Sequence, residues 1–281
     1  MNRIDKVFKE LQNKGEKALI AYISCGDPSL DFTEELVPLL ADSGADLIEL
    51  GIPYSDPVAD GPTIQRASGR ALAGGVTLEK ILSMAKRLRE RTQVPLIMMT
   101  YYNPVYVAGL DSFVEKAALA GVDGLIIPDL PVEEAHTLKM AADKRNVHLI
   151  FLAAPTSTPE RIARIAELSR GFVYCVSVAG VTGARDTTAH GLEGFLNKIR
   201  QYTELPLCVG FGISGPGTAR EAVKHADGVI VGSSLIERIE QALQGENMQG
   251  EGCEPLKAAG PAEAMNSAVQ FIRDIKAAIK K

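Results

Sequence analysis

Residues 47–62 read Leu-Ile-Glu-Leu-Gly-Ile-Pro-Tyr-Ser-Asp-Pro-Val-Ala-Asp-Gly-Pro, and they place one carboxylate inside an apolar segment. The apolar residues on both sides of Glu49 predict a buried strand over residues 46–52. An isolated ionised carboxylate is costly to bury, so a glutamate in such a strand is usually paired with a cation, protonated or used in chemistry. Glu49 is therefore the first candidate for a catalytic residue.

A loop that is rich in turn-forming residues follows this strand and carries two further acids, Asp56 and Asp60. Its three prolines fix backbone angles and hold the loop in place. An embedded acid followed by rigidly mounted acids is the pattern expected of proton-transfer chemistry. Plainer interpretations stay open. Glu49 could form an internal salt bridge, although no inward basic residue is apparent, and the two aspartates could be turn or helix-cap residues.

The order of strand and helix patterns predicts the fold. The expected strands are residues 18–24, 46–52, 95–101, 124–129, 148–154, 172–177, 206–212 and 228–232. The expected helices are residues 31–43, 77–91, 111–120, 132–145, 159–169, 191–202 and 216–226, with amphipathic segments at the N-terminus and at 235–244 and 261–280. Eight alternating units predict a single α/β domain over residues 1–281, a (β/α)8 TIM barrel with an extra helix at each end. An open doubly wound sheet is the alternative, but no Gly-x-Gly-x-x-Gly motif follows the first strand.

Strand alternation predicts which way Glu49 points. The two faces of this strand are Leu47, Glu49 and Gly51 on one side and Ile48, Leu50 and Ile52 on the other. The wholly aliphatic face suits packing against the outer helices. Glu49 is therefore expected to point into the barrel, toward the C-terminal mouth where barrel enzymes hold their active sites.

Two glycine-containing turns near the end of the chain predict a phosphate site. Gly212 ends the seventh expected strand and is followed by Ile213, and Gly232 ends the eighth and is followed by Ser233 and Ser234. Barrels often bind phosphate at these two turns, where backbone N–H groups and a helix dipole converge. The pair Thr182-Gly183 after the sixth strand strengthens the prediction, although ordinary tight turns would show similar residues. No P-loop lysine is present, which argues against a nucleoside triphosphate.

Composition narrows the class of protein. The chain has 281 residues, a formal charge of −5 and no tryptophan, which offers little for nucleic-acid binding. Its four cysteines form no Cys-x-x-Cys pair, and three lie in apolar strands, so we expect buried free thiols and a reducing cytoplasm. The N-terminus is not a signal-peptide pattern, and no apolar run approaches a membrane span. The scattered histidines indicate neither a metal site nor a nucleophilic triad.

Two long segments differ from the other connections. Residues 178–189 contain Gly180, Thr182 and Gly183 and are expected to form a lid over the mouth. Residues 245–260 are polar and glycine-rich, and we expect a flexible insertion before the last helix.

The block from Glu49 to Gln65 closely resembles the signature of the tryptophan synthase alpha chain family. The likeness begins at Gly26-Asp27-Pro28, after the first strand, and extends to the turn at 232–234. It implies a lyase that cleaves indole-3-glycerol phosphate by a retro-aldol step into indole and glyceraldehyde 3-phosphate, in tryptophan biosynthesis. In that case Glu49 is the general acid and base, and Asp60 is its partner carboxylate.

The resemblance also implies a slot for the indole ring. Residues at the matching positions are Tyr22, Met99, Ile126, Tyr174 and Phe211. Taken one by one, they are most simply core residues, and only the family pattern makes them a binding site. Tyr22 and Met99 replace the more common Phe and Leu, so the shape of the slot stays open.

A partner protein is implied in the same way. Members of the family assemble with a tryptophan synthase beta chain as an alpha2beta2 heterotetramer, and pyridoxal phosphate belongs to the beta chain. No cofactor or metal is expected in this chain. The loops after the second and third strands, with Asp56 and an expected Asn103-Pro104 turn, would face the partner.

Two other functions remain as alternatives. Another phosphate-binding barrel enzyme of the same pathway would share the glycine turns, but it should carry an inward lysine or an Asp/Cys pair, which is not apparent. A non-catalytic subunit that only activates its partner would have no reason to keep both Glu49 and Asp60.

Overall fold

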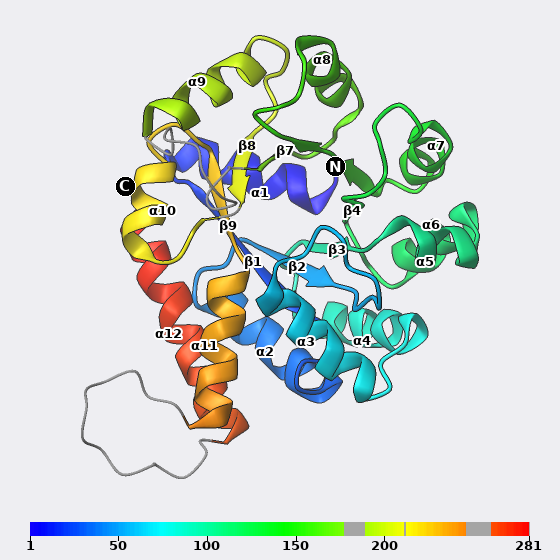
Figure 1. The fold of residues 1–281 in the computed structure, drawn as a ribbon, viewed down its shortest axis with the longest axis vertical. Coiled ribbons are helices and arrows are strands. Elements are labelled where there is room, and N and C mark those ends of the chain that lie inside the picture. The colour runs from blue at the N-terminus through cyan, green and yellow to red at the C-terminus, as the bar shows by residue number, and fades with distance from the viewer. Residues whose placement is uncertain (177–188, 211, 246–259, 281) are drawn as a thin grey trace.

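Parallel strands curl into an almost closed barrel surrounded by helices (Figure 1). The computed structural model describes residues 1–176, 189–210, 212–245 and 260–280. The strands in these ranges are β1 (Ala18–Ser24), β2 (Leu47–Gly51), β3 (Leu96–Met99), β4 (Gly124–Ile126), β5 (His148–Ile150), β6 (Leu152–Ala153), β7 (Val173–Val176), β8 (Leu207–Gly210) and β9 (Gly228–Val231). Their order in the sheet is β5-β4-β3-β2-β1-β9-β8-β7-β6.

The two ends of this order are consecutive in the chain, which closes the barrel. β5 pairs with β4 and β6 pairs with β7, and only Phe151 separates β5 from β6. β5 and β6 are therefore the two parts of the single strand predicted over 148–154. The prediction of eight strand units in one barrel is confirmed, and the seventh and eighth predicted strands are β8 and β9.

Helices follow the strands and form the outer layer. Their bounds are α1 (Arg3–Lys14), α2 (Leu30–Asp42), α3 (Pro62–Ala73), α4 (Leu78–Arg91), α5 (Tyr102–Ala108), α6 (Leu110–Leu119), α7 (His136–Lys144), α8 (Pro159–Leu168), α9 (Ala189–Arg200), α10 (Pro216–Ala222), α11 (Ser233–Gln244) and α12 (Pro261–Ile279). Among these, no helix is long and apolar enough to cross a membrane.

One expectation about the connections is wrong. Asn103 and Pro104 do not form a turn, because both lie in the first turn of α5. Proline is tolerated there, since the first N–H groups of a helix have no intrahelical partner. The backbone N–H of Tyr102, the first residue of α5, has no partner within the helix and donates to the Asp129 carboxylate at 2.8 Å.

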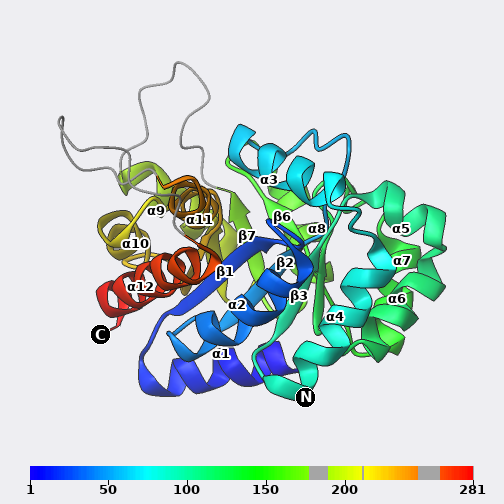
Figure 2. The same cartoon turned by 90° about the horizontal axis from the view of Figure 1, so that it is seen from below.

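Three hydrophobic clusters form the core: an outer cluster between sheet and helices, an inner cluster within the barrel, and a small one where β1, α3 and α11 meet. Ile48 and Leu50 of β2 belong to the outer cluster between sheet and helices. Leu47 belongs to the inner cluster, where Ile4, Phe8 and Leu11 of α1 also pack. α1 thus closes the N-terminal end of the barrel, opposite α3 at the other end (Figure 2). The predicted orientation of β2, with Glu49 on the inner face, is confirmed.

Candidate active site

Glu49 lies at the centre of β2 with its carboxyl group sealed from solvent. Its neighbours in register are Tyr22 on β1 and Ile97 on β3. The residue is 0% exposed, and neither carboxyl oxygen has a hydrogen-bond partner in the described part of the chain. Burial, and secondarily the nearby charge of Asp60, raises the pKa of Glu49 to about 8. The internal salt bridge, the plainer interpretation of this residue, is not formed by any described cation.

Asp60 is half-buried near the end of the loop that follows β2. Its own N–H donates to the Pro57 carbonyl at 3.1 Å, and its carbonyl accepts from the Gln65 side chain at 2.8 Å. The turn is therefore made by backbone atoms, and the carboxylate is left for other contacts. Burial raises the pKa of Asp60, and a hydrogen bond from the Tyr101 hydroxyl opposes that rise.

Tyr101 joins this acidic loop to the barrel. It follows β3, is only 4% exposed, and its hydroxyl oxygen accepts the Ala59 N–H at 3.0 Å. Its ring stacks on Tyr54, with centroids 5.2 Å apart. Because the Ala59 N–H occupies an acceptor position of the Tyr101 oxygen, the hydroxyl proton can be directed to the Asp60 carboxylate.

Asp56, the other acid of this loop, is exposed. Its carboxylate accepts a hydrogen bond from the adjacent Ser55 hydroxyl at 2.6 Å, and its carbonyl accepts the Val58 N–H at 2.9 Å. These are the contacts of a turn residue, and they leave Asp56 away from the buried Glu49.

Four of the expected ring-slot residues meet at the inner face of the barrel. Tyr22, Ile126 and Tyr174 are buried, and Met99 is half-buried against the inner cluster and against the small cluster that contains Tyr22. Gly51 leaves room for the Tyr22 hydroxyl, since a Cβ there would lie 2.2 Å from that oxygen. Gly210 gives Tyr174 the same room, with a corresponding distance of 2.4 Å. Phe211, the fifth expected residue, lies outside the described residues.

The turns after β8 and β9 lie side by side, as the phosphate prediction requires. The Ser234 hydroxyl donates to the Ile213 carbonyl at 2.9 Å and so connects the two turns. Gly212 has a φ of 76°, which favours glycine, and Gly232 precedes α11 without a side-chain cap. The first N–H groups of α11 therefore lack an intrahelical partner and can bind an anion.

Other members of the expected phosphate set contribute differently. Ser233 is exposed at the first position of α11, whereas the Ile213 side chain is buried in the outer cluster, so that only its backbone lies at the turn. A Cβ at Gly232 would contact Tyr22 at 3.3 Å, which places this turn next to the ring slot. Thr182 and Gly183 lie outside the described residues, together with residues 178–188 of the expected lid at 178–189. Residues 246–259 of the expected insertion at 245–260 lie outside them as well.

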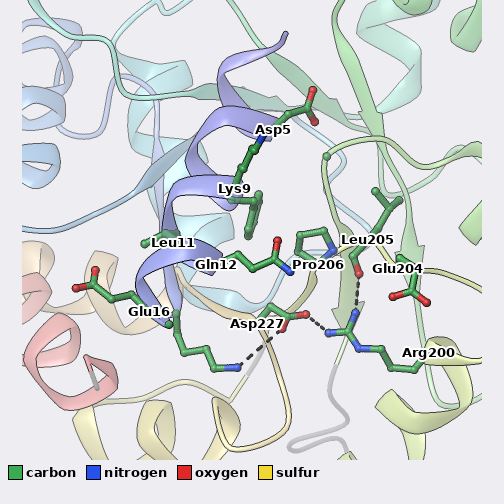
Figure 3. A pocket seen from close by; sticks show the side chains of 14 residues that line it. Asp5, Lys9, Leu11, Gln12, Glu16, Arg200, Glu204, Leu205, Pro206 and Asp227 are labelled. Atoms are coloured by element: carbon green, nitrogen blue, oxygen red, sulfur yellow. Dashed lines mark hydrogen bonds and ion pairs between the residues drawn. The ribbon is translucent and has the colours of Figure 1, made fainter.

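A hollow of about 680 Å³ lies at the opposite end of the barrel beside α1 (Figure 3). Two of its cations, Lys17 and Arg200, already have partners. Lys17 donates to the Ala226 carbonyl at 2.7 Å, Arg200 donates to the Leu205 carbonyl at 2.8 Å, and both pair with Asp227. Because it is far from the C-terminal mouth and both Lys17 and Arg200 are paired with Asp227, we do not assign the chemistry to this hollow.

No cluster of potential metal ligands is formed by the described residues. His148 pairs with Asp5 at 2.8 Å, and His225 lies 3.9 Å from Glu193. Cys25, Cys175 and Cys208 are buried and unpaired, as the apolar strands predicted.

The comparison with known families agrees with this geometry. The family model described as "Tryptophan synthase alpha chain" matches residues 8–266. The chain belongs to the tryptophan synthase alpha chain family. This family cleaves indole-3-glycerol phosphate to indole and glyceraldehyde 3-phosphate in tryptophan biosynthesis, so its members are lyases, and the family implies a beta-chain partner.

Individual relatives cover nearly the whole chain. The tryptophan synthase alpha chain of Caldanaerobacter subterraneus is 51% identical over 85% of this chain and 91% of its own length. The tryptophan synthase alpha chain of Picosynechococcus is 48% identical over 92% of this chain and 99% of its own length. The crystal structure of the alpha subunit from Legionella pneumophila superposes with a TM-score of 0.88 at 36% identity, covering 99% of this chain and 98% of that one. The ligand-free form of a tryptophan synthase mutant from Mycobacterium tuberculosis gives a TM-score of 0.84 at 33% identity, with 99% of both chains covered.

Sequence reasoning missed one residue of this candidate site. Tyr101 was expected only as the last residue of a strand, yet it contacts the loop that carries Asp60. The available signal was its position at the C-terminal end of a barrel strand, where a polar side chain usually serves the active site.

Proposed function

We propose that Glu49 is the general acid and base for cleavage of indole-3-glycerol phosphate, and that Asp60 is its electrostatic partner. The observation that supports this most strongly is the Glu49 carboxyl group, which is fully buried, without a partner among the described residues, and has its pKa raised to about 8. At neutral pH such a group carries a proton, which is the form needed to begin the reaction.

The retro-aldol step needs one proton delivered and one removed. Protonated Glu49 gives its proton to C3 of the indole, which leaves a carboxylate and a positively charged ring. The carboxylate then takes the proton of the neighbouring glycerol hydroxyl while the carbon–carbon bond breaks. The bonding electrons return to the ring, and the products are indole and the aldehyde of glyceraldehyde 3-phosphate. One carboxyl group thus acts in both steps and ends protonated.

Asp60 is assigned to the charge that develops on the ring. When C3 is protonated, positive charge appears at the indole N–H, and a carboxylate there stabilises it. The hydrogen bond from Tyr101 favours the charged form of Asp60, against the effect of burial on its pKa.

The remaining residues are assigned to binding. The ring slot consists of Tyr22, Met99, Ile126 and Tyr174, with Phe211 added from the family pattern. The phosphate site consists of Gly212, Ile213, Gly232, Ser233 and Ser234, with Thr182 and Gly183 added in the same way. The hydrogen bond that connects the turns after β8 and β9 supports this assignment. Phosphate binding at these turns would orient the reacting carbons over Glu49.

We further propose an alpha2beta2 assembly in the cytoplasm, with pyridoxal phosphate in the beta chain and no cofactor in this one. Large apolar side chains are exposed on the loop after β2 and on α5. They are Val58 at 85%, Tyr106 at 67% and Val107 at 78%. Exposed apolar groups gathered near one edge of a mouth suit a protein partner. The buried free thiols suit a reducing compartment.

The direct test is an assay of indole release from indole-3-glycerol phosphate, with and without added beta chain. We expect slow release by this chain alone and faster release as beta chain is added, because a partner that contacts the loop after β2 can favour the arrangement that holds Asp60 in place. No release under either condition would contradict the enzymatic assignment. Release that does not respond to beta chain would contradict the partner assignment alone.

The pH dependence of the same assay tests the role of Glu49. Its pKa is raised to about 8, so the protonated form is lost above that pH. The value of kcat/KM, which reports groups of the free enzyme, should be level from neutral pH to about pH 8 and should then fall toward tenfold per pH unit. A rate that stays level to about pH 10 would show that a different group delivers the proton.

A further inference from the structure

Helices α3 and α11 are joined side to side by polar contacts at the mouth of the barrel (Figure 1). The Thr63 hydroxyl donates to the Glu237 carboxylate at 2.7 Å. One turn further along, Arg66 binds both oxygens of Glu240, at 3.2 and 2.8 Å. Arg70 adds a third hydrogen bond to the same carboxylate at 2.5 Å. We call these five residues the α3–α11 joint.

The joint is partly buried, with the Arg66 side chain 51% exposed, and it has a second anchor. Thr63 is 8% exposed, and the Glu240 side chain is 12% exposed. Arg70 also forms a two-pronged pair with Asp27, at 2.7 and 2.8 Å, and the Asp27 side chain is only 4% exposed. Forked arginine–carboxylate pairs hold direction as well as distance, so the joint restricts how α3 can slide along α11.

The two helices begin at different parts of the proposed site. α3 starts at Pro62, two residues after Asp60, and α11 starts at Ser233, within the proposed phosphate turn. Beneath the joint, Ala67 of α3 and Ile236 of α11 pack on the buried ring of Tyr22. Tyr22 is in turn the β1 neighbour of Glu49. The joint thus lies directly between the proposed phosphate site, the acidic loop and the ring slot.

We propose that the α3–α11 joint transmits phosphate binding to Asp60, so that Thr63, Arg66, Arg70, Glu237 and Glu240 are positioning residues for cleavage. This inference rests on the proposed function, because it takes the turn at Gly232 as the phosphate site. Binding energy from a remote, non-reacting group raises the rate only when it is used to arrange the reacting centre. A rigid connection from the phosphate-binding helix to the helix that follows Asp60 supplies such a route.

The test uses a substrate without its phosphate, indole glycerol, and supplies phosphite dianion separately. In the wild-type chain, phosphite should bind the vacated phosphate position and accelerate indole release from indole glycerol. Glu240→Gln and Thr63→Val should reduce this acceleration by about tenfold or more, because a small displacement of a reacting group is enough to cause such a loss. The phosphite concentration that gives half of the effect should change little, since neither side chain belongs to the proposed phosphate site.

The chain offers a matched control in Glu34. Its carboxylate receives a similar fork from Arg87, at 2.9 and 2.6 Å, and its side chain is 15% exposed, but it connects α2 to α4 in the outer layer. Glu34→Gln should keep the full phosphite effect. Thermal melting of all three variants shows whether each is folded, and Thr63→Val, which keeps the shape of the side chain, serves if Glu240→Gln is unstable.

The outcomes separate the inference from the proposed function. Equal acceleration by phosphite in the wild type and in both joint variants would overturn the inference, as would a wild type that cleaves the intact substrate but does not respond to phosphite. Failure to cleave intact indole-3-glycerol phosphate would overturn the proposed function instead. A loss in Glu34→Gln equal to that in Glu240→Gln would show a general effect of weakened helix packing and would also contradict the inference.

Discussion

Glu49→Gln should abolish indole release while leaving the barrel folded. The amide has nearly the shape of the carboxyl group but cannot give its proton to indole C3 or take the hydroxyl proton afterwards. The loss should therefore appear in kcat, whereas binding of glycerol phosphate, which is assigned to the turns after β8 and β9, should be retained. The measurement is steady-state indole release together with calorimetric titration of glycerol phosphate. Near-normal turnover by this variant would show that Glu49 is structural.

The same variant has an expected signature in stability. The pKa of Glu49 rises from an ordinary 4.5 to about 8 in the folded chain. Between these values the folded state binds more protons than the unfolded state, so the free energy of unfolding of the wild type falls as pH rises through that window. The amide that replaces the carboxyl group does not titrate, so the variant should gain Tm relative to the wild type from about pH 5 to pH 8, and the difference should then level off.

Asp46→Asn is a control for which the opposite result is expected, a loss of stability without a loss of cleavage. This carboxylate is also largely buried, but it lies just before β2, near the N-terminal end of the barrel, and it accepts hydrogen bonds from Lys276 at 2.6 Å and from the Leu19 N–H at 2.7 Å. Its replacement should lower the Tm and leave cleavage close to normal at temperatures where the variant is folded. If Glu49→Gln gave this pattern, its role would be the same as that of Asp46.

The orientation of Glu49 could be predicted because it depends on local alternation. In a strand the side chains alternate between two faces, so the aliphatic residues at 48, 50 and 52 were sufficient to place Glu49 on the other face. The turns at Gly212 and Gly232 were predictable for a related reason, since glycine has a direct effect on the backbone. The division of the fifth predicted strand into β5 and β6 at Phe151 could not be predicted, because it depends on how the barrel closes.

Contacts between distant segments were beyond reach of the sequence. The bond from Ala59 to Tyr101 spans 42 residues, and that from Thr63 to Glu237 spans 174. Each depends on the order of strands and on the direction in which a helix leaves its strand. The hydroxyl of Ser234, a residue expected at the phosphate site, donates to the Ile213 carbonyl in the structure. Side-chain direction at a turn is decided by the neighbouring turn, which no local pattern encodes.

Asp60→Asn should lower the rate of cleavage by about 10²–10³, the usual effect of removing one positioned electrostatic group from an active site. The fold should be nearly unaffected, because the turn around Asp60 uses its backbone N–H and carbonyl, which asparagine retains. The residual activity carries a second signature. The charge of Asp60 raises the pKa of Glu49, so its removal should move the alkaline fall in rate to lower pH. Asp56→Asn is the matched control, since Asp56 is exposed in the same loop and bonded to Ser55, and it should cleave the substrate at close to the normal rate without beta chain. Equal losses in the two variants, or a loss in Asp60→Asn that follows a fall in Tm, would assign Asp60 to the structure of the loop and leave the ring charge to another group.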